Sequence, residues 1–341
     1  MKKKSFLYFV LCSWIVLAIV GIIGAETKDK KENKVEAAFE FSEDYSPDFS
    51  DELDGKYIRD IFLWHRNDYT VYVECIRPKK SRFEKNILLV HGLTFSSHEF
   101  DVEYEDYSLV RRLADEGYAV WRLDITGYGL SEMVEDGFMP DTDYAADDIN
   151  MVVENIVKTT GQDKIDILGW SWGTVTTSRF VKNNDEHINS IVLYAPLLTG
   201  VGDYEVKEPF THINWYFAVD DFQTKEDGNV DYDIMDPAVI GIYCSNCWCW
   251  DGDSSPNGGR RDICVPETEK LIDLDAIKKP TLVIYGDKDP YMNFQALDNV
   301  IDELPEGSRV EVIEGGAHSM MLEKPYHREF QDKIVDFLKS N

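Results

Sequence analysis

The segment Gly169-Trp170-Ser171-Trp172-Gly173 constrains the fold more than any other stretch of this chain. It follows an apolar run at residues 164–168, which predicts a buried strand, and it precedes a helical pattern over residues 174–183. A sharp turn from strand to helix strains its central residue, so the residues two positions before and two after must lack bulky side chains. Glycine meets this need at both positions. The sequence therefore predicts that Ser171 stands at the end of a sheet, where its hydroxyl can act as a nucleophile.

A serine nucleophile requires a histidine base and a carboxylate that orients the histidine. Two strand-like runs further along, residues 280–285 and 309–313, end in loops that offer these groups. The first loop carries Asp287 and Asp289, and the second carries His318. On the residues alone, either aspartate can be the acid, and Ser171 also suits an ordinary helix N-cap.

Five segments, in order, resemble the α/β-hydrolase family over about residues 69–338. They are the turn around Ser171, the two loops just described, and the stretches NILLVHG at residues 86–92 and DITGYGLS at residues 124–131. The resemblance implies a mostly parallel central sheet with helices on both faces and a lid inserted after the sixth strand. It also assigns Ser171 as nucleophile, His318 as base, and Asp289 in preference to Asp287 as acid.

The resemblance further implies an oxyanion hole built from two backbone N–H groups. One belongs to Trp172, directly after the nucleophile, and the other to Leu93, which follows His91-Gly92. Such a mechanism needs no cofactor. No two histidines stand four residues apart in the sequence, and no metal is expected.

Strand-like and helix-like stretches alternate along most of the chain, as in a parallel sheet covered by helices. The alternation stops between Pro196 and Lys279, where aromatic residues are frequent. We therefore expect one catalytic domain over residues 54–341, with a lid over about residues 197–279. The aromatic side chains of the lid either shape an apolar acyl or aryl pocket or form the lid's own small core.

Four cysteines cluster in the expected lid: Cys244, Cys247, Cys249 and Cys264. In an oxidising compartment they predict two disulfides, with three connectivities open. A zinc knot is the alternative, but the spacing C-x2-C-x-C-x14-C is not a usual zinc pattern. Disulfides are therefore the expectation.

The N-terminus carries a targeting pattern. Three lysines at residues 2–4 precede an apolar run over residues 6–23 and the small residues Gly24 and Ala25. Residues 1–25 therefore predict a cleaved signal peptide or, because the run is nearly long enough to span a bilayer, an uncleaved membrane anchor. The charged residues 26–53 predict a flexible tether or a propeptide. Both alternatives place the catalytic domain outside the cytoplasm, either secreted or membrane-anchored.

The formal net charge of −29 disfavours nucleic acid as a partner. The leading hypothesis is an esterase that acts on a small-molecule or lipid-like ester, because the matched motifs are similar to those of lysophospholipase and monoacylglycerol lipase relatives. The turn at Ser171 also resembles that of proline iminopeptidases, which hold a free amino terminus with acidic groups. Candidates for such groups are Glu205, Glu208, Asp220 and Asp221. A non-catalytic binding protein is the third alternative.

Overall fold

The computed structural model describes residues 44–80, 83–219, 222–297 and 300–341. Within these residues nine strands form the main sheet, in the spatial order β1-β2-β3-β5-β4-β6-β7-β10-β11. The first four strands in that order pair antiparallel, and every pair from β5 to β11 is parallel. The predicted mostly parallel sheet is confirmed. The strands are β1 (Phe49–Leu53), β2 (Tyr57–Arg66), β3 (Tyr69–Pro78), β4 (Asn86–Val90), β5 (Ala119–Leu123), β6 (Ile165–Trp170), β7 (Ile188–Tyr194), β10 (Thr281–Gly286) and β11 (Arg309–Ile313).

The central strands β4, β5 and β6 are buried along their whole length. Parallel strands that are covered on both faces carry apolar side chains at successive positions, which explains runs such as NILLV in β4. Side chains on the two faces enter two separate clusters of buried apolar residues, one on each side of the sheet.

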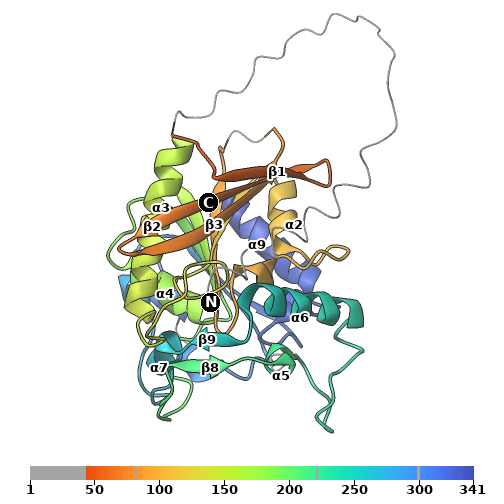
Figure 1. Ribbon diagram of the computed structural model, residues 1–341. Coiled ribbons are helices and arrows are strands. Elements are labelled where there is room, and N and C mark those ends of the chain that lie inside the picture. The colour runs from red at the N-terminus through yellow and green to blue at the C-terminus, as the bar shows by residue number, and fades with distance from the viewer. Residues whose placement is uncertain (1–43, 81–82, 220–221, 298–299) are drawn as a thin grey trace, which may run out of the picture. The chain divides into compact units, whose positions relative to one another are not determined.

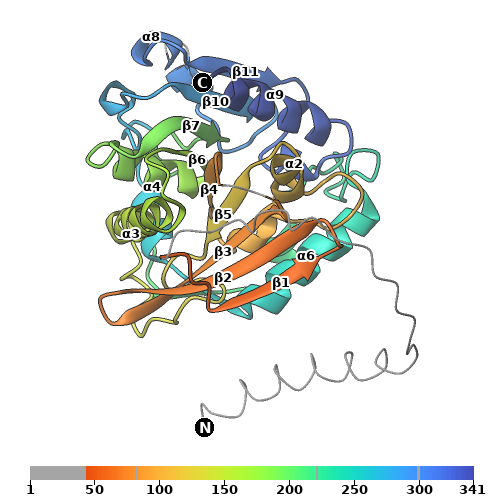
Figure 2. The ribbon, with the colours of Figure 1, turned by 90° about the horizontal axis from the view of Figure 1, so that it is seen from above.

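Helices cover both faces of the sheet, as predicted (Figures 1 and 2). One face carries α2 (Leu109–Asp115) and α9 (His327–Ser340), and the other carries α3 (Thr142–Thr160), α4 (Trp172–Val181) and α8 (Val300–Glu303). Helix α3 begins after Asp141, whose side chain accepts the Tyr144 N–H, and ends at Gly161 with φ 69°. A short 3-10 helix, Phe294–Leu297, precedes α8.

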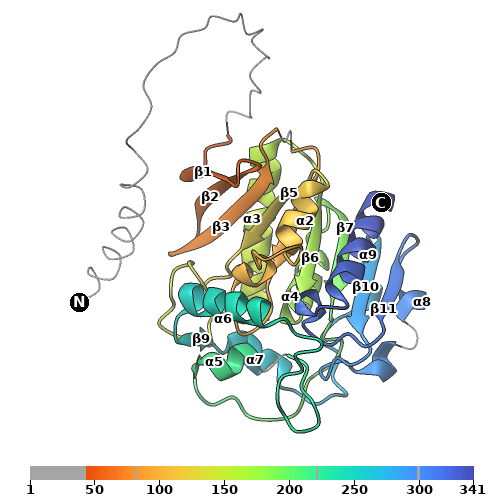
Figure 3. The same ribbon diagram turned by 90° about the vertical axis from the view of Figure 1, so that its right-hand side faces the viewer.

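The segment between β7 and β10 departs from the alternation, as expected for an insertion. It contains β8 (Phe210–His212), α5 (Trp215–Val219), α6 (Pro237–Asp251), β9 (Ser254–Pro256) and α7 (Gly258–Ile263). Strands β8 and β9 pair with each other, apart from the main sheet. Figure 3 shows α5, α6 and α7 gathered at one end of that sheet. The insertion follows the seventh strand along the chain rather than the sixth, because β1 adds a strand at the N-terminal edge.

Strand β1 corrects part of the predicted tether. Its residues, Phe49–Leu53, pair antiparallel with β2, so this end of the segment 26–53 is structured although most of its side chains are solvent-exposed. Backbone hydrogen bonds to an edge strand do not require apolar side chains, which is why the composition was misleading. Residues 26–43 and the predicted signal peptide or anchor at residues 1–25 lie outside the described residues. Within the described residues we find no helix with the length and hydropathy of a membrane span.

The predicted disulfides are wrong, because all four cysteines of the insertion are free. Cys244, Cys247 and Cys249 lie on the single helix α6, and the first two are buried in the apolar cluster on one side of the sheet. Cys264 is buried in the cluster on the other side. A buried free cysteine packs as a small apolar side chain. Among the described residues, no group of three or more histidine, cysteine or acidic side chains could hold a metal ion.

Candidate active site

Ser171 occupies the turn between β6 and α4, with φ 55° and ψ −123°. A positive φ is strained for a residue that carries a side chain. A Cβ atom at position 169 would overlap the carbonyl oxygen of Gly173, and one at position 173 would overlap the carbonyl oxygen of Val90. Both glycines are therefore required by close backbone packing, as the sequence predicted. The turn holds Ser171 at the end of β6.

The loop that follows β4 lies directly beside the serine. A Cβ atom at position 92 would come within 2.9 Å of the Ser171 Cβ, so glycine is needed for this approach. The buried ring of His91 braces the loop: its Nδ1 lies 2.9 Å from the Gly92 carbonyl oxygen, and its Nε2 accepts the Ile125 N–H at 3.0 Å. Burial lowers the pKa of His91 to about 4, which keeps this ring neutral. Leu93 lines the same pocket as Ser171.

Trp172 is the first residue of α4. An N–H group in the first turn of a helix has no carbonyl acceptor within that helix, and the helix dipole favours negative charge there. The Trp172 indole is buried and donates from Nε1 to Thr142 Oγ1 at 3.1 Å, so its side chain belongs to the core. Both residues expected to supply oxyanion donors, Leu93 and Trp172, thus lie on segments that adjoin Ser171.

His318 lies in the loop after β11, and it lines the same pocket as Ser171. Its Nδ1 is 2.8 Å from Oδ2 of Asp289, which lies in the loop after β10. Both side chains are buried. Because a carboxylate accepts hydrogen bonds, Nδ1 carries the proton, and Nε2 is the basic nitrogen of the neutral ring.

Asp287, the rival acid, makes different contacts. Its Oδ1 accepts the Gly315 N–H at 2.6 Å, and its Oδ2 lies 3.6 Å from Lys288 Nζ. Its side chain is 39% exposed, whereas that of Asp289 is fully buried. Of the two aspartates, the structure brings Asp289 to the histidine.

Buried donors hold the loop that carries His318. Trp170 Nε1 and Tyr194 OH both donate to the His318 carbonyl oxygen, at 3.1 and 2.8 Å. Glu323 accepts the Ala317 N–H at 3.1 Å and the Gln223 side-chain N–H at 2.9 Å. Burial raises the pKa of Glu323 to about 7, against the lowering effect of these hydrogen bonds. The insertion therefore reaches the His318 loop through Gln223.

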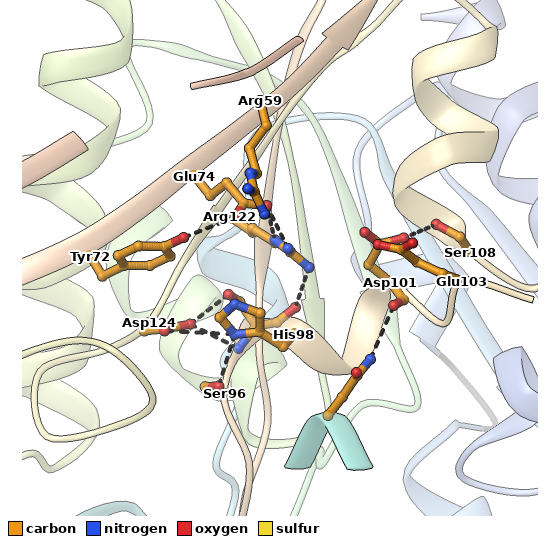
Figure 4. Close-up of polar contacts among 12 residues, drawn as sticks. Arg59, Tyr72, Glu74, Ser96, His98, Asp101, Glu103, Ser108, Arg122 and Asp124 are labelled. Carbon is orange, nitrogen blue, oxygen red and sulfur yellow. Dashed lines mark hydrogen bonds and ion pairs between the residues drawn. The ribbon is translucent and has the colours of Figure 1, made fainter. Parts of the chain in front are cut away.

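A buried polar network supports the segment that follows β4 (Figure 4). Asp124 accepts the backbone N–H and the hydroxyl of Ser97, at 3.1 and 2.5 Å. Arg122 donates from Nε to Glu74 Oε1 at 2.9 Å, and Glu74 also accepts the Tyr72 hydroxyl at 2.9 Å. Glu74 and Arg122 face each other across the β3–β5 pair, where opposite charges attract. The network joins these two strands to the segment just beyond Leu93.

The pocket that contains Ser171 and His318 has a volume of about 120 Å³. The insertion contributes Phe217, Arg260 and Ile263 to its lining. A larger pocket of about 500 Å³ shares Val201 and Tyr291 with it. Of the aromatic residues of the insertion, Tyr204 and Phe217 line this pocket, whereas Phe222 and Tyr243 are buried in the apolar cluster.

Arg260 was missed by the sequence analysis. It lies on α7 and lines the pocket beside the serine and the histidine. A signal was available, because Arg260-Arg261 is a pair of adjacent basic residues in an acidic chain. The sequence analysis considered the aromatic residues of the insertion as pocket-lining groups, and the structure adds a cationic side chain to that lining.

One family model and one curated protein match most of this chain, and a second curated protein matches a short part of it. The family model Hydrolase_4, described as "Serine aminopeptidase, S33", matches residues 81–325. A putative non-heme chloroperoxidase of Synechocystis sp. is 26% identical over 248 residues, which are 69% of this chain and 84% of that protein. Monoacylglycerol lipase ABHD6 of Mus musculus is 37% identical over 67 residues, which are 20% of this chain and 19% of that protein.

Solved structures share the fold at low sequence identity. The structure of a thermophilic esterase from Thermogutta terrifontis has a TM-score of 0.60 and 17% identity, and the match covers 82% of this chain and 98% of that one.

Proposed function

Because this chain belongs to the serine aminopeptidase family of α/β hydrolases, we propose that it is a serine hydrolase that cleaves carboxylic esters through an acyl-enzyme on Ser171. One observation carries the proposal: Ser171 and His318 line one pocket, and Asp289 is hydrogen-bonded to the far side of the His318 ring. Export of the domain from the cytoplasm is part of the proposal, and it rests on the N-terminal sequence alone.

In this mechanism Nε2 of His318 accepts the Ser171 proton while the serine oxygen attacks the ester carbonyl carbon. The tetrahedral oxyanion accepts hydrogen bonds from the N–H groups of Leu93 and Trp172, each of which lowers the barrier by about 3 kcal/mol. His318 returns the proton to the leaving alcohol, and Asp289 stabilises the imidazolium meanwhile. A water molecule, deprotonated by His318, then attacks the acyl-enzyme and restores the serine.

The pocket favours ester hydrolysis over aminopeptidase activity. An aminopeptidase needs carboxylates that bind the substrate's ammonium group, yet the described lining of the pocket with Ser171 contains none. Glu205 and Glu208 are exposed outside that lining, and Asp220 and Asp221 lie outside the described residues. The strained serine and the buried histidine–aspartate pair favour catalysis over a binding scaffold, since a scaffold needs neither.

Purified protein should be assayed with p-nitrophenyl esters and aminoacyl anilides, and labelled with a fluorophosphonate. We expect ester turnover, little anilide turnover, and labelling of the wild type. Ser171→Ala should abolish labelling, and either Ser171→Ala or His318→Ala should lower kcat by on the order of a millionfold, as in other serine hydrolases.

The control is Ser178→Ala, which replaces a buried serine on α4, the helix that begins directly after Ser171. This variant should keep its label. Anilide turnover without ester turnover would favour the aminopeptidase alternative. Absence of both turnover and labelling in folded protein would favour the non-catalytic alternative.

A further inference from the structure

Arg260 lies where a substituent of the substrate would lie. Its Nη2 donates to Thr94 Oγ1 at 2.7 Å, and its Nε donates to Asn257 Oδ1 at 3.2 Å. Thr94 directly follows Leu93, the residue expected to bind the oxyanion. The guanidinium group therefore contacts the residue next to the proposed oxyanion donor Leu93, and it lies in the pocket that contains Ser171.

The surroundings of Arg260 contain acceptors but no partner charge. Its partners Thr94, Asn257 and Tyr204 are neutral, and within the described lining of this pocket only the Arg260 side chain carries a permanent charge. The next residue, Arg261, instead lies near Asp141 and Asp262, at 3.5 and 3.6 Å. The chain has 64 acidic and 35 basic residues, so carboxylates are abundant. A cation that has no carboxylate partner at the site is suited to binding an anionic ligand.

Arg260 is held in place before any ligand binds. Asn257 Oδ1 also accepts the Thr211 hydroxyl at 2.7 Å, and Asn257 Nδ2 donates to the Glu208 carbonyl oxygen at 2.9 Å. A Cβ atom at Gly259 would overlap the ring of Trp172, so α7 packs tightly against the residue that follows the nucleophile. A positioned guanidinium loses little entropy on binding an anion.

We propose that the ester substrate carries an oxyanion, a carboxylate or a phosphate, and that Arg260 binds it. This inference rests on the proposed ester hydrolysis. A guanidinium has five N–H donors; the bonds to Thr94 and Asn257 use two of them, and the hydroxyl of Tyr204 is a third neutral partner, so donors remain for an anion. Paired N–H groups match the geometry of both oxyanions, and charge-assisted hydrogen bonds are the stronger kind.

The two adjoining pockets accept different parts of the proposed substrate. The pocket at Arg260 measures about 120 Å³, so it suits a short group that bears the anion. The adjoining pocket of about 500 Å³ includes Glu267, together with Met292 and Phe294, in its lining. A carboxylate repels an anion, so the larger and uncharged part of the ester lies there.

Matched ester pairs test the proposal. The carboxylate pair is the p-nitrophenyl monoester of succinic acid and its methyl-capped neutral analogue. The phosphate pair is a monoacylglycerol phosphate and the parent monoacylglycerol. For at least one pair, the wild type should show roughly 10- to 100-fold higher kcat/KM for the anionic member. Arg260→Gln should remove that preference, Arg260→Lys should retain part of it, and Arg261→Gln should leave the ratio as in the wild type.

The responsive pair identifies the anion. The proposal is overturned if neutral esters are cleaved but neither pair shows a preference, or if Arg260→Gln and Arg261→Gln change the ratio alike. In both cases ester hydrolysis itself stands. Absence of turnover for all four esters, together with absence of Ser171-dependent labelling, would instead overturn the proposed function and this inference with it. Because the readout is a ratio, partial unfolding of a variant does not affect it.

Discussion

The central sheet and the insertion contribute to the candidate site in different ways. The sheet places Ser171, Asp289 and His318 at the ends of β6, β10 and β11, where backbone contacts hold each loop. The insertion contributes side chains, Phe217 and Arg260, from two short helices. The proposed reactive groups lie in turns and loops at strand ends, and the groups proposed to contact the rest of the substrate lie on the insertion.

This difference predicts which substitutions lower kcat and which change KM. Changes at the strand ends should lower kcat, because they remove interactions that strengthen in the transition state. Changes in the insertion should act on KM and on the choice of substrate, since they remove contacts made equally before and during the reaction. The predictions below are chosen to break this division if it is wrong.

After the losses expected at Ser171 and His318, the largest effect separates the two aspartates after β10. Asp289→Ala should lower kcat by on the order of ten-thousandfold, because the imidazolium loses its buried partner. Asp287→Ala, the matched control, removes an exposed carboxylate that contacts a backbone N–H, and should cost less than about tenfold. Steady-state kinetics on one ester measures both. Equal losses, or a severe loss at Asp287 alone, would reject the assignment of Asp289.

The next effect concerns Glu323, where the insertion meets the His318 loop. Its pKa rises from 4.5 to about 7 on folding, so the folded state binds this proton more tightly, and stability falls as pH rises through that range. Glu323→Gln should lack this fall, which amounts to about 3 kcal/mol. Urea unfolding at pH 4.5 and pH 8 measures the difference.

Glu314→Gln is the control for this prediction, because Glu314 is exposed in the same loop. It should keep the pH dependence of the wild type. A Glu323→Gln variant whose free energy of unfolding falls with pH as steeply as that of the wild type would show that Glu323 does not carry the effect.

The smallest effect concerns the insertion alone. Phe217→Ala should raise KM for an ester with an apolar acyl group by roughly 3- to 10-fold, and should affect kcat less, because it removes half-buried apolar surface from the pocket. Tyr232→Ala removes an exposed aromatic of the same insertion and should not change KM. A loss confined to kcat at Phe217 would contradict the division between sheet and insertion.

Much of the sheet was predictable because its strands have local signatures. Residues 309–313 were predicted as a strand with the bounds that the structure shows, since they form a short run of mostly β-branched residues between polar turns. The turn at Ser171 was predictable for a related reason: glycine at positions 169 and 173 reports close backbone packing that no larger residue permits.

The insertion was poorly predictable because its features depend on partners distant in sequence. All four of its cysteines were expected in disulfides, yet three of them lie on one helix, and Cys264 is buried on the other side of the sheet. Strand β1 escaped prediction because its pairing with β2 uses the backbone, whose hydrogen bonds leave no pattern in the side chains.

By itself, the sequence indicated the class of fold, the serine and the histidine of the candidate site, and two possible acids, because strand periodicity and glycine spacing are local properties. Tertiary structure alone decided which aspartate meets His318, and that Arg260 rather than Arg261 turns toward the serine. Neighbouring residues of the same type differ in burial and in contacts, and those are set by chain segments far away in sequence.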